Sequence, residues 1–326
     1  MDYDIDRITA AISAATHVNC TDEGVLIFLD EIQEAKNGIT SLKYFQENAP
    51  HLHVIVAGSL LGIQLFAPKL QELLKYYYYV GGMPEAVQSF CQYRDWQEVR
   101  AIQKEILRSY ERDFSKHAPG EIAPRIHDLW LSLPSQLSKE NRKFIYGLVK
   151  QGARAREYEI ALQWLLDGGL IHRVNSIKAA RLPLRSYEDR SAFKIYCVDI
   201  GLLGAMCSLD SAALIEGSRV FTEFKGALTE QYVLQQLVGD VELFYYAKPN
   251  SKQEVDFLIQ SGMDVIPIEV KAEVNIKAKS LKQFVTENAS RHDYRLSMND
   301  FRQESWLTNL PLYAAERILS IDCPVH

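Results

Sequence analysis

The residues best suited to chemistry lie near the C-terminus, where carboxylates and a lysine alternate with apolar side chains. Asp256 and Glu269 each lie in such an alternating segment, and Lys271 follows Glu269 by two positions. Alternation predicts two β-strands whose polar side chains share one face. Carboxylates opposed on a strand pair repel each other, and Mg²⁺ between them would remove that repulsion. Lys271 on the same face would orient or activate a water beside the metal.

The turn between the two segments decides which residues face each other. Residues 261–264, Ser-Gly-Met-Asp, offer a two-residue hairpin loop with Gly262 at its first central position, as a type II′ turn requires. Counting outward from this loop places Asp256 opposite Glu269. The expected polar face comprises Glu254, Asp256, Glu269 and Lys271. The expected apolar face comprises Val255, Phe257, Ile259, Ile266, Ile268 and Val270.

Two further residues bear on this site. A helical segment, residues 221–237, precedes the hairpin and carries Glu230, which we expect as an additional acid. Pro267 lies within the second strand, where it cannot donate a hydrogen bond to a neighbour. Pro267 therefore predicts a bulge or an unpaired edge at that point.

A second acidic pair lies near the N-terminus. The apolar run of residues 25–29 ends in Asp30 and Glu31, and a second apolar run, residues 53–57, is followed by Ser59. In nucleotide-hydrolysing folds an acid at such a strand end holds Mg²⁺, and a following glutamate can polarise the attacking water. The alternative is an acid that caps the next helix. A polar helical stretch, residues 38–47, separates the runs and favours a β-α-β arrangement.

Several motifs together resemble a known family. They are Asp30-Glu31-Ile32-Gln33, Leu42-Lys43-Tyr44-Phe45, Ala57-Gly58-Ser59-Leu60-Leu61-Gly62 and Gly81-Gly82-Met83-Pro84-Glu85-Ala86. The chain resembles, over nearly its whole length, bacterial and archaeal AAA-type ATPases fused to a C-terminal nuclease-like domain. The resemblance implies that Asp30 is a Mg²⁺ ligand, Glu31 the catalytic base and Ser59 the γ-phosphate sensor.

The same resemblance assigns roles at the other end of the chain. A glutamate on a helix, an aspartate on a strand and Glu-x-Lys on the next strand resemble the PD-(D/E)xK nuclease fold. It implies that Asp256 and Glu269 bind Mg²⁺, that Lys271 assists the water and that Glu230 completes the site. The alternative is a nuclease-like fold used only for binding.

The sequence departs from this family in its nucleotide site. No G-x-x-x-x-G-K-[ST] string, which would cradle the phosphates, occurs anywhere in the sequence. The stretch between Gly62 and Gly81 is also shorter than the family's ATPase core. We therefore expect no productive ATP binding by the first 66 residues, and we expect a shortened parallel sheet to expose apolar edges and faces.

The middle of the chain has the pattern of a winged helix, which the family also carries here. Residues 141–150 and 155–167 are predicted helices, and residues 170–175 and 193–198 are predicted wing strands. Arg154 and Arg156, at the start of the second helix, are candidate phosphate contacts within a basic stretch. Acidic residues on the same helix count against insertion into a DNA groove, so a protein-contact or packing role stays open.

Composition limits the function classes. The net charge of −6 gives no general case for nucleic-acid binding, and no apolar run approaches the ~20 residues of a membrane span. Five cysteines without a C-x-x-C pair disfavour a zinc site or a disulfide framework and fit a cytoplasmic protein.

We therefore predict an α/β protein of four parts. These are a truncated AAA ATPase core (1–66), a helical connector (67–118), a winged-helix domain (119–215) and a restriction-endonuclease-like α/β domain (216–326). The predicted function is that of a truncated AAA-family ATPase-like protein whose C-terminal domain acts on or binds nucleic acid with Mg²⁺, without hydrolysing ATP unaided. The alternatives are a non-catalytic DNA- or protein-binding regulator and a non-functional remnant. No membrane partner is expected, and the sequence fixes no oligomeric state.

Overall fold

The protein is a mixed α/β protein made of two compact units, Met1–Glu72 and Leu73–His326. The computed structural model describes residues 4–22, 24–29, 32, 35, 38–56, 61–138, 142–212, 222–251, 253–272, 278–288, 290 and 292–322. Within these segments no helix combines the length and the apolar character needed to cross a bilayer.

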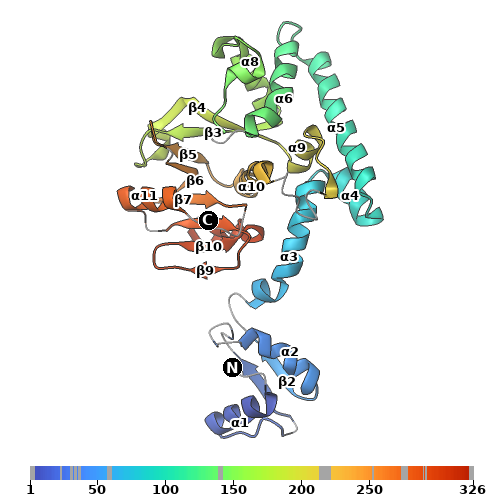
Figure 1. Ribbon diagram of the computed structural model, residues 1–326, viewed down its shortest axis with the longest axis vertical. Helices are drawn as coiled ribbons and strands as arrows, with labels where there is room; N and C mark the ends of the chain where they lie inside the picture. The colour runs from blue at the N-terminus through green and yellow to red at the C-terminus, as the bar shows by residue number, and fades with distance from the viewer. Residues whose placement is uncertain are drawn as a thin grey trace. The chain divides into compact units, whose positions relative to one another are not determined.

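The first unit is a small β-α-β layer, as predicted. Its elements are α1 (Ile5–Thr16), β1 (Leu26–Leu29), α2 (Gly38–Asn48), β2 (His53–Val56) and the start of α3 (Leu61–Val80). β1 and β2 pair in parallel, and Ile5, Ile8, Phe45 and Ala49 form a small core from α1 and the α2 region (Figure 1).

The other face of this two-stranded sheet is uncovered. Phe28 and Ile55 lie side by side in the register and are 59% and 49% exposed, and Leu26 is 53% exposed. The expectation that a shortened parallel sheet exposes apolar side chains is therefore confirmed. Asp30, Glu31 and Ser59, the predicted nucleotide-site residues, lie outside the described residues.

The second unit begins with a helical part. Its helices are the end of α3, α4 (Pro84–Tyr93), α5 (Trp96–His117), α6 (Ala123–Leu137), α7 (Tyr146–Val149), α8 (Ala155–Asp167) and α9 (Ile200–Met206).

The predicted helix at 155–167 is confirmed, because α8 has the same bounds. The predicted helix at 141–150 is wrong for most of its length, because α7 has a single turn. Phe144 N–H donates to Phe193 O at 2.7 Å, and Ile145 exchanges two hydrogen bonds with the Gln136 side chain. These bonds hold residues 144–145 in an extended conformation.

A mixed sheet of eight strands follows the first helices of the second unit. Its strands are β3 (Ile171–Ile177), β4 (Glu188–Cys197), β5 (Phe244–Ala247), β6 (Glu254–Ser261), β7 (Asp264–Val270), β8 (Tyr294–Ser297), β9 (Arg302–Gln303) and β10 (Thr308–Pro311). Their spatial order is β4-β3-β5-β6-β7-β8-β10-β9, which can be followed from top to bottom in Figure 1. The short 3₁₀ turns Leu184–Tyr187 and Leu312–Ala314 connect elements of the unit.

The predicted wing strands are part of this sheet. β3 and β4 pair antiparallel, as a wing hairpin should, but β3 also pairs in parallel with β5. The predicted boundary between residues 215 and 216 therefore falls between strands of one sheet. As a result, Lys194 of β4 can form an ion pair with Glu254 of β6.

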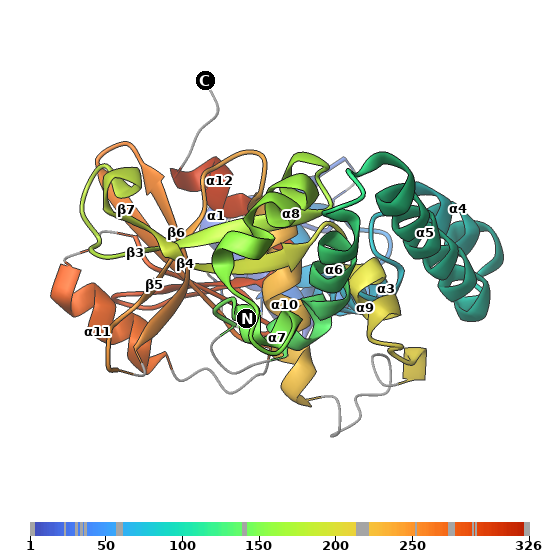
Figure 2. The same ribbon diagram turned by 90° about the horizontal axis from the view of Figure 1, so that it is seen from above.

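Helices cover both faces of the sheet. α10 (Thr222–Leu237) and α12 (Arg317–Asp322) contribute to the main core, whereas α11 (Lys279–Asn288) packs with Phe244, Val255 and Leu258 in a second cluster. Figure 2 shows α11 and α12 on opposite sides of the strands. Apolar side chains on both faces explain why β6 and β7 contain few exposed positions.

A β-bulge interrupts the alternation in β6. Phe244 of β5 faces Leu258, but Tyr246 faces Val255, so β6 carries an extra residue between these two pairs. The prediction that Val255 shares a face with Phe257 is therefore wrong, since Val255 packs in the α11 cluster and Phe257 in the main core. Asp256 and Phe257 lie within this bulge, and bulges commonly redirect side chains in this way next to functional sites.

Candidate active site

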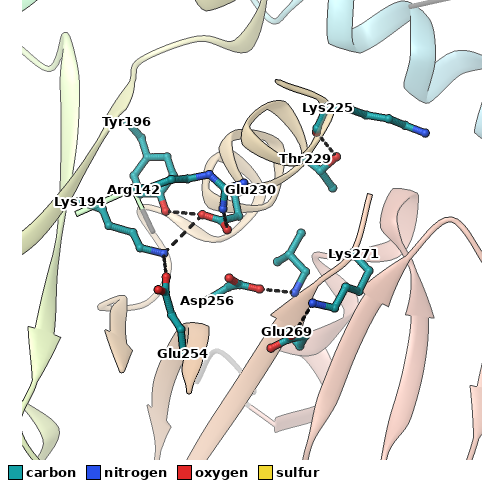
Figure 3. A network of polar contacts seen from close by, with 11 residues as sticks. Arg142, Lys194, Tyr196, Lys225, Thr229, Glu230, Glu254, Asp256, Glu269 and Lys271 are labelled. Atoms are coloured by element: carbon teal, nitrogen blue, oxygen red, sulfur yellow. Dashed lines mark hydrogen bonds and ion pairs between the residues drawn. The ribbon is translucent and has the colours of Figure 1, made fainter. Parts of the chain in front are cut away.

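The sheet and α10 bring the predicted C-terminal residues into one pocket. A cavity of about 840 Å³ is lined, among others, by Glu230, Asp256, Glu269 and Lys271. These side chains come from α10, from β6 and from the end of β7, and they point toward one another in Figure 3. Glu254 lines the same cavity, which confirms that the four residues of the predicted polar face lie together.

The hairpin turn has the predicted form. Ser261 pairs with Asp264, and Gly262 has a φ of +55° while Met263 keeps a negative φ, as a type II′ turn requires. The ladder runs outward to Phe257 opposite Ile268. Pro267 lies just before the stretch of β7 that pairs with β8, so its missing N–H falls at an unpaired edge.

Asp256 and Glu269 are the next residues outward along this hairpin. The Asp256 carboxylate accepts a hydrogen bond of 2.7 Å from Val270 N–H, which holds its side chain at the end of β7. Lys271 Nζ forms an ion pair with Glu269 Oε1. The other oxygen, Glu269 Oε2, is buried and has no hydrogen-bond partner among the described residues. The end of β7 thus presents two carboxylates and one ammonium group.

Glu230 lies in a dense network of donors and cations. Arg142 Nη1 pairs with Glu230 Oε1, Tyr196 Oη donates to Glu230 Oε2 at 3.0 Å, and Lys194 Nζ lies 3.6 Å from Oε2. Burial acts to raise the pKa of Glu230, but the positive charges of Arg142 and Lys194 outweigh it and lower this pKa to about 2. Glu230 is therefore a carboxylate at neutral pH.

The pKa of Asp256 shifts in the opposite direction to that of Glu230. Burial, together with the negative charges of Glu230 and Glu269, raises the pKa of Asp256 well above its usual range. Because the neighbouring cations keep Glu230 charged, Asp256 is the acid of this pair that takes up a proton more readily. Burial likewise raises the pKa of Glu269, against the opposing effect of Lys271.

Lys194 of β4 is the least expected member of the site. Its side chain is completely buried, and its Nζ lies 2.5 Å from Glu254 Oε1 and 3.6 Å from Glu230 Oε2. The ring centre of Tyr245 lies 4.9 Å from the same nitrogen. Burial acts to lower the pKa of Lys194, but nearby acidic groups, Glu230 foremost, outweigh this effect and raise the pKa above its ordinary value. Lys194 is therefore a buried ammonium group between two carboxylates (Figure 3).

The sequence patterns missed Arg142, Lys194 and Tyr196 as site residues. A signal existed for two of them. Lys194 lies two positions before Tyr196 in the second, mostly apolar half of β4, and both side chains share a face of this strand. A lysine in a buried strand needs a negatively charged partner. Arg142 carries no such signal, because it reaches Glu230 from a loop with a left-handed φ of 43°.

The remaining predicted residues lie elsewhere. Arg154 and Arg156 are exposed at the start of α8 and do not line the pocket of Asp256. Arg156 borders a separate cleft together with the acids Glu159 and Asp167. Contact of these arginines with nucleic acid stays a prediction.

The carboxylates of this pocket are candidate ligands for a divalent metal ion. Within the described part of the chain, no three His, Cys, Asp or Glu side chains form a ready metal site. Mg²⁺ needs fewer protein ligands than this, because it keeps several waters and commonly takes one or two carboxylates. The unpartnered Glu269 Oε2 beside Asp256 fits that smaller requirement.

The fold and the pocket define a class: an α/β protein with a carboxylate-lysine centre at the end of a strand pair. Residues 71–213 match the model of the domain of unknown function DUF8612, and residues 225–313 match that of the domain of unknown function DUF4143. No curated protein and no solved structure matches the sequence. The polar network of Figure 3 takes residues from both matched regions. Arg142, Lys194 and Tyr196 come from the first, and the four acids and Lys271 come from the second.

Proposed function

We propose that the second unit hydrolyses phosphodiester bonds in nucleic acid, with Asp256, Glu269 and Lys271 as its reacting centre. The observation that carries this proposal is the ion pair between Lys271 and Glu269 directly beside Asp256, inside a pocket. The pocket is also lined by Lys143, Lys178 and Lys248. The surrounding lysines suit the binding of a polyanion through its phosphates. The acids and Lys271 at the centre suit the cleavage of one of its phosphodiester bonds.

Each group has a role in this proposal. Asp256 and Glu269 would hold one Mg²⁺, which when bound polarises a phosphoryl oxygen as a Lewis acid. Lys271 Nζ, held by Glu269, donates a hydrogen bond to a water or to a phosphate oxygen beside them. Lys143, Lys178 and Lys248 bind neighbouring phosphates and fix the register of the strand.

An endonuclease assay tests the proposal. Supercoiled DNA and labelled RNA are incubated with the wild type, Asp256→Ala and Asp240→Ala in Mg²⁺ or Mn²⁺. Asp240 is an exposed acid in the turn after α10 and serves as the matched control. Loss of the metal ligand should lower the rate by about 10²-fold or more, whereas Asp240→Ala should keep it. Equal cleavage by the wild type and Asp256→Ala would end the enzyme proposal.

For the first unit we propose an ATPase-type β-α-β segment that does not hydrolyse ATP unaided. The matched model of residues 225–313 supports the AAA-type resemblance, since that domain is often associated with AAA-like ATPases. The sequence offers no glycine-rich loop for the phosphates. Isothermal titration with ATP and Mg²⁺ should give no tight binding, and a tight complex would overturn this part.

A second candidate function, non-catalytic binding, is favoured by one specific observation. Glu230 and Glu254 are already neutralised within the chain by Arg142 and Lys194. Buried acids compensated in this way can also serve as structural ion pairs. This candidate expects DNA binding that Asp256→Ala leaves unchanged and that Lys143→Glu weakens, without cleavage by any variant. Fluorescence anisotropy with labelled DNA measures it.

A further inference from the structure

We propose that the Lys194 ammonium group occupies the position of a divalent cation between Glu230 and Glu254, so that the chain binds one divalent ion fewer than its carboxylates would otherwise hold. The placement of any ion at Asp256 and Glu269 rests on the proposed function. The part played by Lys194 does not, because it concerns a different pair of carboxylates.

The geometry around Lys194 is that of a bound cation. Its Nζ lies between Glu254 Oε1 at 2.5 Å and Glu230 Oε2 at 3.6 Å, and the side chain has no exposed surface. Lys194 therefore places one positive charge between the two carboxylates, where a bound cation would also lie.

The charge balance of the pocket leads to the same conclusion. Its central acids are Glu230, Glu254, Asp256 and Glu269, and the cations that pair with them are Arg142, Lys194 and Lys271. Lys194 is the cation that pairs with Glu254, and it also lies beside Glu230. Its positive charge makes a divalent ion at the same place unfavourable.

Removal of Lys194 would change this balance at one place. Lys194→Ala leaves Glu230 and Glu254 without their shared cation and leaves open the space of the lysine side chain. Glu230 keeps its ion pair with Arg142, whereas Glu254 loses the cation that neutralises it. Oxygen ligands that face each other in such a space suit Mg²⁺ or Mn²⁺. The variant should therefore gain a divalent ion that the wild type cannot hold.

Equilibrium dialysis with Mn²⁺ counts the ions bound by each full-length chain. If the proposed function is right, the wild type binds one ion and Lys194→Ala binds two. If the metal site at Asp256 and Glu269 is wrong, the wild type binds none and Lys194→Ala binds one, and the Lys194 inference still stands. Equal numbers for the wild type and Lys194→Ala overturn it.

Two further measurements locate the extra ion and guard against a variant that does not fold. The double variant Lys194→Ala/Glu254→Gln removes one ligand and should bind the same number of ions as the wild type, so an extra ion retained there overturns the proposed position. Thermal melting of Lys194→Ala should show a cooperative transition that Mn²⁺ raises more than it does in the wild type. A variant that stays unfolded at saturating Mn²⁺ also overturns the inference.

Discussion

The side chain of Gln231 on α10 binds both backbone groups of Cys197 on β4. Cys197 N–H donates to Gln231 Oε1 at 2.9 Å, and Gln231 Nε2 donates to Cys197 O at 2.7 Å. The neighbouring residue on each element belongs to the candidate site, since Glu230 meets Tyr196 there. The two hydrogen bonds therefore fix the helix that carries Glu230 against the strand that carries Tyr196 and Lys194.

Replacement of Gln231 by leucine should destabilise the second unit. The change leaves two buried backbone groups of Cys197 without partners, at a cost of about 1–3 kcal/mol each. Gln235→Leu is the matched control one turn later, because Gln235 Nε2 donates to one backbone group only, Val198 O at 3.2 Å, and Gln235 Oε1 accepts a long bond of 3.5 Å from Gln231 Nε2. Urea unfolding should show a clearly larger loss for Gln231→Leu, and equal losses would contradict the role given to Gln231.

Gly201 and Gly204 in α9 should respond in opposite ways to alanine. A Cβ on Gly201 would lie 2.5 Å from Val80 O and 2.6 Å from the Gln103 amide, whereas the nearest atoms to a Cβ on Gly204 lie at 3.7 Å. Overpacking costs about 1–3 kcal/mol, but alanine in a helix with free space gains up to about 1 kcal/mol over glycine.

Thermal melting of the two variants measures this difference. Gly201→Ala should melt at a lower temperature than the wild type, and Gly204→Ala at the same temperature or higher. Equal destabilisation by both variants would contradict the short distance between Val80 O and the Cβ position of Gly201.

His172 should make stability depend on mild acid. Burial lowers the pKa of His172 in the folded chain below its ordinary value. Between the unfolded value of about 6.5 and the lower folded value, the unfolded state takes up a proton that the folded state does not. Stability is therefore lost as the pH falls through this window. Denaturant unfolding at pH 7 and pH 5 should show a smaller loss for His172→Gln than for the wild type. His117→Gln, an exposed control on α5, should behave as the wild type.

Asp256→Asn should be more stable than the wild type when no metal is present. The raised pKa of Asp256 means that the folded state favours its neutral form, so the wild type loses stability as the pH rises through that value. Asparagine is neutral at every pH and can still accept the Val270 N–H bond. Melting in EDTA at pH 8 should therefore favour the variant, and millimolar Mn²⁺ should raise only the wild type. A wild type that melts higher in EDTA would contradict this account of the pocket.

The local patterns near the C-terminus were sufficient to predict a large part of the site. The glycine of the loop at 261–264 set the turn, the turn set the strand register, and the register brought Asp256 and Glu269 to the same end of the hairpin. The bulge beside Asp256 was not predictable in this way. It depends on how β5 pairs with β6, and the apolar run Phe257-Leu258-Ile259 in β6 does not show where an extra residue falls.

The sequence by itself determined the α/β class, the hairpin and the acids with Lys271, because each depends on residues close together in the chain. Only the tertiary structure decided what surrounds those acids. Lys194 and Tyr196 reach Glu230 because the predicted wing strands join the main sheet, and Arg142 reaches it from a distant loop. Charge compensation in a buried pocket depends on distances in space, and the spacing of residues along the chain does not encode those distances.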